Sequence, residues 1–423
     1  MSGEGQTFVI VGAALAGGKA AETLRAEGFA GRIVLIGEET ERPYERPPLS
    51  KGYLLGKDPR DKAYVHDAGW YAANDVELLL GVTATAVDPK AHTVTIDAVE
   101  PLRYDKLLLA TGSRVRRLDI PGADNLGIRY LRTLVESDAL RGDLRPGSQV
   151  AVIGAGWIGL EVAAAARHHG ATVTVVEVDT LPLRRVLGDE VATVYANLHR
   201  AHGVDFRFGV GIREFGGAGG RLTHIVLEDG SEIPADVAVV GVGIRPATEL
   251  AEAAGLHVDN GIVTDAQLRT SDPDIFACGD VANSYHPILE RQVRVEHWAN
   301  AQNGGKAAAL SMLGRDAVYD KLPYFYSDQY ESKPGTGMEY SGYVEPGKYD
   351  QVVFRGDPTI RPDANPEFIA FWVKGGRVLA GMNVNIWDVV KPIQNLVRAG
   401  YAGKTVDLAR LADPSVPLED LLT

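Results

Sequence analysis

Two glycine-rich turns, about 140 residues apart, carry the clearest chemistry in this chain. They lie within residues 8–17 and 150–159, and each follows an apolar β-branched run and precedes an alanine-rich amphipathic stretch. A strand, a glycine turn and a helix in this order form a Rossmann dinucleotide-binding unit, in which a pyrophosphate lies at the helix N-terminus. Because one unit holds one dinucleotide, the pair predicts two cofactors that exchange electrons, most simply a flavin and a nicotinamide.

The second turn has all three expected glycines, Gly154, Gly156 and Gly159. The first lets the strand turn sharply, the second lets the backbone approach a pyrophosphate, and the third lets helix and strand pack closely. Trp157 and Ile158, between the second and third glycines, are assigned to the same cofactor site.

An acidic residue follows the second turn at the distance expected of a ribose-binding carboxylate. It is Glu177, 23 residues after Gly154. Its carboxylate accepts hydrogen bonds from a ribose 2′-hydroxyl and repels a 2′-phosphate, which favours NADH over NADPH. Arg184 and Arg185 are close in the sequence and could weaken this preference, since a guanidinium attracts a phosphate.

The first turn departs from the pattern at one position. Gly12 and Gly17 are present, but Ala14 stands where the second glycine is expected, with Ala16 beside the third. A methyl group is the smallest possible intrusion, so we expect dinucleotide binding to survive. Glu38, 26 residues after Gly12, occupies the ribose-binding position.

Composition limits the remaining possibilities. At 423 residues, the chain is long enough for two or three domains, and no apolar run approaches the roughly 20 residues that span a bilayer. The N-terminus has no secretory signal pattern, so we expect a cytoplasmic protein. One cysteine excludes a disulfide framework and a cysteine-rich iron–sulfur or zinc site, and no metal is expected. The net charge of −13 argues against nucleic acid as a partner.

The elements that must position these residues fall into three predicted domains. Residues 88–97 and 104–110 are expected to form strands, 237–243 closes the second Rossmann unit, and 270–280 is a buried strand before a helical stretch. We therefore predict an α/β protein with two Rossmann-like domains, one inserted in the other, plus a C-terminal α+β domain. The predicted ranges are 1–112 with 244–322 for the first, 113–243 for the second and 323–423 for the third.

The C-terminal domain is predicted from a change in sequence texture. Aromatic and β-branched runs alternate with turns, at 323–328, 337–343, 351–355, 368–374 and 378–384. A helix is expected over 387–399, and the last twenty residues should form a short helix or a loose tail.

Five further motifs are specific enough to indicate a family, at residues 41–51, 274–280, 296–301, 325–330 and 337–340. With them, nearly the whole chain resembles the flavoprotein ferredoxin reductases of oxygenase systems, which have a glutathione-reductase-like fold. Between the last two motifs, residues 331–336 make the connection a few residues longer than the family pattern.

The resemblance implies specific roles around FAD. Asp280 holds the ribityl chain, Arg46 contacts the adenosine diphosphate part, and Pro47 lies along the flavin. Lys51 approaches flavin N5 with Glu161 as its ion partner, and a lysine there favours the electron-rich reduced flavin. By residue type alone, Asp280 could equally cap a helix and Lys51 could be a solvated turn lysine.

Other positions are assigned to cofactor contacts by the same resemblance. Trp298 packs at the pyrimidine end of the flavin, although a lone tryptophan is more often a core residue, and His297 has no specific role assigned. The remaining contacts are Val82, Ala110, Thr111, Gly112, Gly279 and Glu296 for FAD, and Gly243 with Arg184 for NADH.

The implied reaction passes hydride from NADH to FAD and then single electrons to an iron–sulfur ferredoxin, which supplies a cytochrome or Rieske-type oxygenase. Disulfide reductases of this fold use paired cysteines after the first Rossmann unit, where this chain has residues 46–51. Its one cysteine, Cys278, is predicted to be a buried packing residue, so electrons leave directly from the flavin. We expect a monomer or a weak homodimer with a basic rim for the ferredoxin, drawn from Arg291, Arg294, Lys306, Arg315, Lys391 and Arg398.

Two other functions fit the same sequence. One is a reductase of a small-molecule acceptor, of the quinone or monodehydroascorbate type. The other is a redox signalling flavoprotein like apoptosis-inducing factor, for which the lack of a targeting segment and of long basic tracts is unfavourable.

Overall fold

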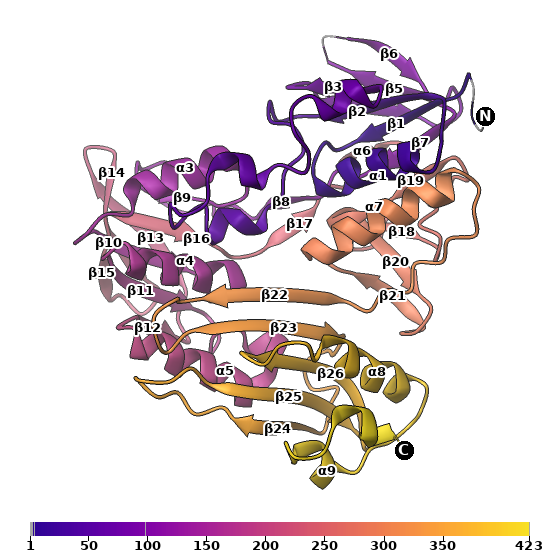
Figure 1. Cartoon of the computed structure of the whole chain (residues 1–423). Helices are drawn as coiled ribbons and strands as arrows, with labels where there is room; N and C mark the ends of the chain where they lie inside the picture. The colour runs from indigo at the N-terminus through magenta and orange to yellow at the C-terminus, as the bar shows by residue number, and fades with distance from the viewer. Residues whose placement is uncertain (1–2, 4, 98, 423) are drawn as a thin grey trace. The chain divides into compact units, whose positions relative to one another are not determined.

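The computed structural model describes residues 3, 5–97 and 99–422 (Figure 1). The chain divides into two compact units. The first unit comprises Met1–Glu45, Arg60–Arg114 and Arg245–Pro323, and the second comprises Arg46–Pro59, Val115–Ile244 and Tyr324–Thr423.

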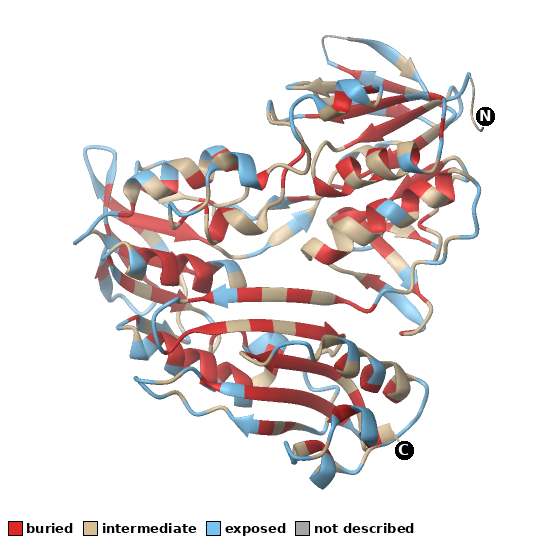
Figure 2. Cartoon of the chain, in the orientation of Figure 1, coloured by how far each residue is buried: buried red, intermediate tan, exposed pale blue. Residues whose placement is uncertain are grey.

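The first unit is built on a five-stranded parallel sheet. Its strands, in spatial order, are β19 (Ile275–Ala277), β7 (Lys106–Leu109), β1 (Thr7–Val11), β2 (Arg32–Gly37) and β3 (Val76–Leu80). Alternate side chains of β1 enter two different cores. Phe8 and Ile10 pack with helices α1 (Leu15–Ala26) and α7 (Trp298–Met312). Val9 and Val11 lie on the other face and pack with the meander β4 (Ala84–Asp88), β5 (Thr93–Ile96) and β6 (Val99–Arg103). Both faces of β1, β2, β7 and β19 are covered, which fits their continuous apolar runs, whereas the edge strand β3 is only partly buried (Figure 2).

Two local predictions in the first unit were wrong. Residues 88–97 contain the end of β4, a turn and β5 instead of one strand, because Asp88 Oδ1 accepts hydrogen bonds from the backbone N–H groups of Lys90 and Ala91. The helical stretch expected after residue 280 is a single 3-10 turn, η3 (Gly279–Val281), followed by β20. The other elements of this unit are β18 (Ile262–Thr264), β20 (Ala282–His286), β21 (Arg291–Arg294), α2 (Trp70–Ala73), α6 (Glu249–Ala253) and η2 (Arg60–Ala63).

The second unit contains another five-stranded parallel sheet. Its strands are β12 (Asp205–Phe208), β11 (Thr172–Glu177), β10 (Gln149–Ile153), β16 (Val237–Val240) and β9 (Ile128–Arg129), in spatial order. The α-helices of this part are α3 (Leu134–Asp143), α4 (Trp157–His168) and α5 (Arg184–Ala201). A three-stranded meander comprises β13 (Ile212–Ala218), β14 (Arg221–Leu227) and β15 (Glu232–Pro234). The 3-10 helix η1 (Pro47–Ser50) lies in the segment Arg46–Pro59. The short strands β8 (Ser113–Val115) and β17 (Ile244–Pro246) stand where the chain passes between units. Two parallel sheets of this kind confirm the predicted fold class.

The C-terminal part of the second unit forms an antiparallel sheet, as predicted. Its order is β22 (Tyr324–Gln329), β23 (Thr336–Gly342), β26 (Arg377–Val384), β25 (Glu367–Lys374) and β24 (Gln351–Asp357), accompanied by α8 (Val390–Tyr401), α9 (Leu408–Ala412) and η4 (Leu418–Leu422). The long connection 331–336 lies in the turn between β22 and β23, where Gln329 pairs with Thr336. Helix α8 begins three residues later than predicted, because Asn385 and Asp388 have positive φ angles that end any regular structure there.

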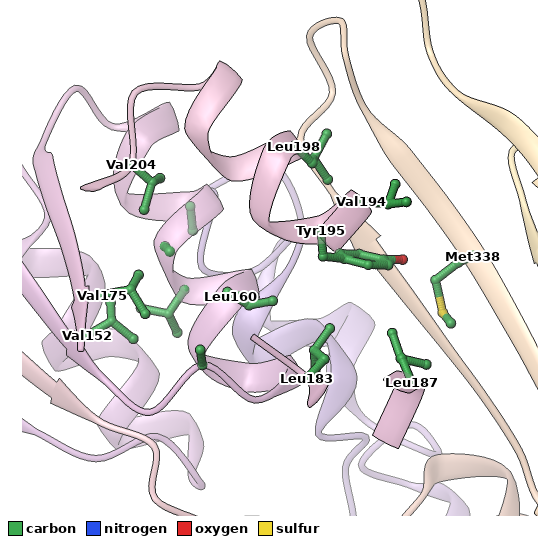
Figure 3. Close-up of a cluster of buried hydrophobic side chains, with 14 of the residues drawn as sticks. Val152, Leu160, Val175, Leu183, Leu187, Val194, Tyr195, Leu198, Val204 and Met338 are labelled. Atoms are coloured by element: carbon green, nitrogen blue, oxygen red, sulfur yellow. The ribbon is translucent and has the colours of Figure 1, made fainter. Parts of the chain in front are cut away.

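The parallel sheet and the antiparallel sheet of the second unit share one hydrophobic core. Figure 3 shows Leu187 and Tyr195 of α5 beside Met338 of β23. The buried indole of Trp372, in β25, donates a hydrogen bond to the carbonyl oxygen of Leu187 at 3.0 Å. Helix α5 opens at this point, since Gly188 has non-helical angles that leave the Leu187 carbonyl available.

The C-terminal tail is held by one buried arginine. The guanidinium of Arg355 in β24 donates to four backbone carbonyl oxygens, those of Leu411, Asp413, Pro414 and Val416, at 2.5–3.4 Å. The tail is therefore anchored, and it contains both α9 and η4.

We expect Arg355→Ala to release this tail, because four carbonyl groups lose a charged donor. Calorimetry should show the unfolding midpoint of the second unit lowered by about 5 °C, and limited proteolysis should cut the tail faster. Arg361→Ala is the control, since Arg361 forms an exposed ion pair with Asp357 and should shift the midpoint by less than about 1 °C. Equal effects of the two variants would contradict the anchoring role.

Candidate functional site

The second glycine turn joins β10 to α4, and the space around each glycine matches its predicted task. Gly154 has a φ of +100°, and a Cβ atom there would lie 2.5 Å from the carbonyl oxygen of Gly241. A Cβ atom at Gly159 would lie 2.1 Å from the carbonyl oxygen of Gly154. Gly156 differs, because no described residue beyond its chain neighbours comes within 4 Å of a Cβ placed there. This open face fits the approach of a pyrophosphate to the backbone.

The first turn, between β1 and α1, has the same two tight positions. A Cβ atom on Gly12, which has a φ of +122°, would lie 2.1 Å from the carbonyl oxygen of Ala110, and one on Gly17 would lie 2.1 Å from that of Gly12. Ala14 precedes the helix with a φ of −109° and a ψ of −162°. Any residue adopts this extended conformation, so the alanine adds no backbone strain and the turn still fits a dinucleotide.

A glycine pair inside α7 joins the first turn to the Gly279 turn. A Cβ atom on Gly305 would lie 2.3 Å from the carbonyl oxygen of Ala16, and one on Gly304 would lie 3.7 Å from the backbone nitrogen of Gly279. This pair was not among the residues predicted from the sequence. The available signal was two adjacent glycines within a helix, which lower helix stability and so indicate close packing.

The N-terminus of α7 gathers the predicted residues around Asp280. Arg294 donates to the backbone carbonyl of Asp280 at 3.3 Å and forms an ion pair with Glu296. His297 directly precedes the helix, and Trp298 is its first residue. Burial lowers the pKa of His297 to about 4, against the opposing effect of the Asp280 carboxylate. The imidazole is therefore neutral at physiological pH.

This pKa predicts how stability depends on pH. The unfolded imidazole takes up a proton near its ordinary pKa of about 6.5, whereas the folded one resists protonation until about pH 4, so stability falls as pH drops between these values. The free energy of unfolding is expected to fall by about 3 kcal/mol once the His297 imidazole is fully protonated. The unfolding midpoint measured from pH 7 to 4.5 should fall less steeply in His297→Gln than in wild type. His257→Gln, at an exposed histidine, should leave the slope unchanged; a common slope for all three proteins would refute the assignment.

The end of β7 is positioned by hydrogen bonds to residue 247. Ala110 donates its backbone N–H to the carbonyl oxygen of Val11 at 2.8 Å, which keeps it beside β1. Thr111 Oγ1 donates to the carbonyl oxygen of Ala247 at 2.8 Å, and the Ala247 N–H donates to Gly112 at 3.0 Å. The threonine hydroxyl thus orders the segment next to the first glycine turn.

Glu38 lies directly after β2, as predicted, and half of its side chain is exposed. The Val82 N–H donates to the carbonyl oxygen of Gly37 at 3.2 Å, so these two predicted contacts are adjacent. Arg114 lies 3.3 Å from the Glu38 carboxylate and is a neighbour that sequence analysis missed.

An ion pair with a buried carboxylate lies in the second unit. Lys51 Nζ lies 2.8 Å from Glu161 Oε1, and only 2% of the Glu161 side chain is exposed. Two hydroxyls also bind this carboxylate: Ser50 Oγ donates to Oε2 at 2.5 Å and Ser327 Oγ donates to Oε1 at 2.6 Å. The predicted pair is confirmed as an ion pair, and the two serines were missed. Lys51, Ser50 and Ser327 thus give the buried Glu161 carboxylate three donors, which offset the cost of removing it from water.

Arg46 and Pro47 lie next to this pair in sequence. Arg46 directly precedes η1 and donates to the backbone carbonyl of Arg132. Pro47 is the first residue of η1, where a missing N–H costs nothing. Their contacts with FAD stay predictions.

The carboxylate of Glu177 organises the second turn. It accepts hydrogen bonds from the backbone N–H groups of Ala155 at 2.7 Å and Asp179 at 2.9 Å. Arg184 donates to Asp179 at 3.1 Å and to Asp189 at 2.6 Å, and both carboxylates raise its pKa. The positive charge that could attract a 2′-phosphate is therefore shared by two carboxylates, which supports a preference for NADH.

The remaining residues assigned to NADH lie around the same turn. Ile158 is an exposed apolar side chain, 46% exposed, and its contact with NADH stays a prediction. Trp157 instead packs edge-on against Phe325, with ring centroids 5.3 Å apart, and so contributes to the core. Gly243 has a φ of +99°, and its carbonyl oxygen accepts a hydrogen bond from the backbone N–H of Arg116 at 2.9 Å.

Other kinds of site are not found among the described residues. None of the described helices is long and apolar enough to cross a membrane, and the described side chains form no group of three or more that could hold a metal ion. Cys278 is a buried free thiol whose pKa is raised to about 12 by burial, as expected of a packing residue.

Two protein-family models match the chain. One, described as pyridine nucleotide-disulphide oxidoreductase, matches residues 6–305, and the other, described as reductase C-terminal, matches residues 324–422. The ferredoxin–NAD(+) reductase component of an anthranilate 1,2-dioxygenase system from Burkholderia cepacia is 42% identical over 98% of this chain and 99% of the relative. Putidaredoxin reductase from Pseudomonas putida is 38% identical over 98% and 96% of the two chains.

A solved structure agrees with these relatives. A chain in the crystal structure of the covalent putidaredoxin reductase–putidaredoxin complex matches with a TM-score of 0.91 and 37% identity, over 98% of both chains. The resemblance drawn from the motifs is thereby confirmed. This chain belongs to the pyridine nucleotide-disulphide oxidoreductase family, in the branch that carries a reductase C-terminal domain and includes the ferredoxin–NAD(+) reductases.

Proposed function

We propose that this protein is an FAD-containing reductase that takes hydride from NADH and delivers single electrons to the iron–sulfur ferredoxin of an oxygenase system. Bound FAD supplies the step from two-electron to one-electron transfer. The relatives named as ferredoxin–NAD(+) reductase components support the reaction, and the covalent complex with putidaredoxin supports the kind of partner.

The observation that carries this proposal is the joint occurrence of a buried Lys51–Glu161 pair and a single, buried cysteine. One thiol cannot form the paired-cysteine relay of a disulfide reductase, and a pKa of about 12 keeps Cys278 unreactive. Electrons therefore leave without a thiol intermediate. The chain's own residues bind both dinucleotides, orient them and hold the Lys51 ammonium where negative charge develops.

The three predicted domains are assigned by the sheets that they contain. We assign 1–112 and 244–322 to FAD, 113–243 to NADH, and 323–423 to a C-terminal domain that packs on the core of the NADH domain. Each of the first two contains a parallel sheet with its own glycine turn, and the third is antiparallel. A cytoplasmic location belongs to the same proposal, with the free thiol of Cys278 as support.

The test is an anaerobic titration followed by an acceptor assay. NADH should bleach the flavin spectrum of the purified protein, and reduction of cytochrome c should then depend on added putidaredoxin. Fast turnover with quinones and none with ferredoxins would replace this proposal with a small-molecule reductase. Slow NADH oxidation, with a change of oligomeric state on reduction, would replace it with a signalling flavoprotein.

A further inference from the structure

The carboxylate of Glu161 is the end of a longer chain of buried side chains. Ser327 donates to Glu161 at 2.6 Å, and Gln329 Nε2 donates to Ser327 Oγ at 3.2 Å. Gln329 Oε1 lies 2.8 Å from His199 Nε2, and His199 Nδ1 lies 2.8 Å from the hydroxyl of Tyr330. Ser327, Gln329 and His199 are each at most 2% exposed.

The hydrogen bonds between these buried side chains all run in the same direction, from donor to acceptor toward Glu161. Gln329 uses its amide nitrogen on Ser327, so its oxygen must accept from His199, and Nε2 of His199 carries the proton. The other ring nitrogen, Nδ1, is then an acceptor and takes the hydroxyl proton of Tyr330. Burial lowers the pKa of His199 to about 4, so the ring is neutral, as this pattern requires. All four hydrogen bonds are therefore donated toward the carboxylate.

The outer end of the chain is fixed by stacking. The rings of Tyr330 and His202 stack with their centroids 3.5 Å apart and their planes 4° from parallel. His202 Nε2 lies 2.6 Å from the carbonyl oxygen of Pro334. Tyr330 directly precedes the long connection 331–336, and Pro334 lies within it. The sheet hairpin thus restricts Tyr330, and through it the ring of His199.

We propose that Ser327, Gln329 and His199 are positioning residues for flavin reduction, which hold the Glu161 carboxylate so that Oε1 faces the Lys51 ammonium. The inference rests on the proposed function, since it assigns to Lys51 the role described above. An amide cannot pass a proton along such a chain, so the chain orients groups and does not conduct protons. Ser50 on Oε2 and Ser327 on Oε1 together set the plane of the carboxylate.

The main test compares Ser327→Ala with Ser341→Ala in the holoenzyme. Ser341 is equally buried, lies in the neighbouring strand and bonds to Gln394 at 3.3 Å instead of to Glu161. Stopped-flow reduction by NADH should be about tenfold slower in Ser327→Ala, with the apparent Kd for NADH unchanged, because one hydrogen bond to a buried charge is lost. The flavin midpoint potential, measured by photoreduction without NADH, should become more negative. Ser341→Ala should match wild type in both, and Ser327→Thr should restore both.

A second readout does not depend on turnover. The ring-nitrogen NMR signals of His199 should show Nε2 protonated in wild type, and they should shift in Ser327→Ala, although Gln329 stands between the two residues. Wild-type rate and potential in Ser327→Ala, or an unchanged His199 signal, would overturn the inference even where thermal stability drops. Failure of the proposed function is distinct, because it would show in the wild-type protein as flavin that NADH does not bleach or as electron transfer that does not depend on ferredoxin. The flavin potential and the His199 signal of Ser327→Ala would still test the positioning role of Ser327, Gln329 and His199.

Discussion

Replacing Lys51 with alanine is expected to slow flavin reduction by NADH about 100-fold while FAD stays bound, in line with the loss of one fixed charge at a reacting centre. The ammonium is held by a buried carboxylate 2.8 Å away, and only 15% of the Lys51 side chain is exposed. Anaerobic stopped-flow measurement of flavin bleaching, with the flavin content of each preparation, checks this. Lys57→Ala is the matched control, because Lys57 lies in the same segment, pairs with Glu331 and is more exposed.

The same substitution leaves Glu161 buried without its cation, so part of any effect could come from lost stability. The double variant Lys51→Met with Glu161→Gln removes both charges and keeps the volume. It should regain thermal stability and remain slow. An unchanged rate in Lys51→Ala would remove Lys51 from the mechanism, and a double variant as fast as wild type would show that the rate reflects folding.

Glu177→Ala should reduce the ratio of kcat/KM for NADH to that for NADPH by about tenfold, since the 2′-hydroxyl loses its acceptor and a 2′-phosphate loses its repulsion. Adding Asp179→Ala should reduce it further, to about 100-fold below wild type. Asp179 binds Arg184 at 3.1 Å and also pairs with Arg185, so its removal frees Arg185 and leaves Arg184 with one carboxylate, that of Asp189, which makes both guanidinium groups better ligands for a phosphate.

Initial rates with each nucleotide over a range of concentrations provide the ratio. Glu190→Ala, at an exposed acidic residue of α5, controls for a general change of charge in this region. A ratio that does not move in Glu177→Ala would show that another residue decides the cofactor. A double variant no different from Glu177→Ala would show that Arg184 does not reach the ribose.

Elements that depend on local apolar patterns were predicted correctly, whereas those that depend on a single side-chain hydrogen bond or an unusual backbone angle were not. Strand β1 and the turn at Gly12 depend on apolar runs and on one backbone conformation, both of which are local, and they were predicted correctly. The turn at Asp88 was missed because one side-chain hydrogen bond to Lys90 competes with a strand pattern that continues through it. The start of α8 was displaced for a similar reason, since the positive φ of Asp388 leaves no trace in hydrophobic periodicity.

The sequence by itself determined the two dinucleotide turns, the acidic residues that follow them and the lack of a thiol relay, because each depends on residue types at short, fixed spacings. The tertiary structure alone decided how Glu161 is held. Ser50 is 111 residues from Glu161 in the chain and Ser327 is 166 residues away, and the bond between His199 and Gln329 spans 130 residues. Hydrogen bonds at such separations form only after α4, α5 and β22 have packed on a common core, and no local pattern encodes that packing.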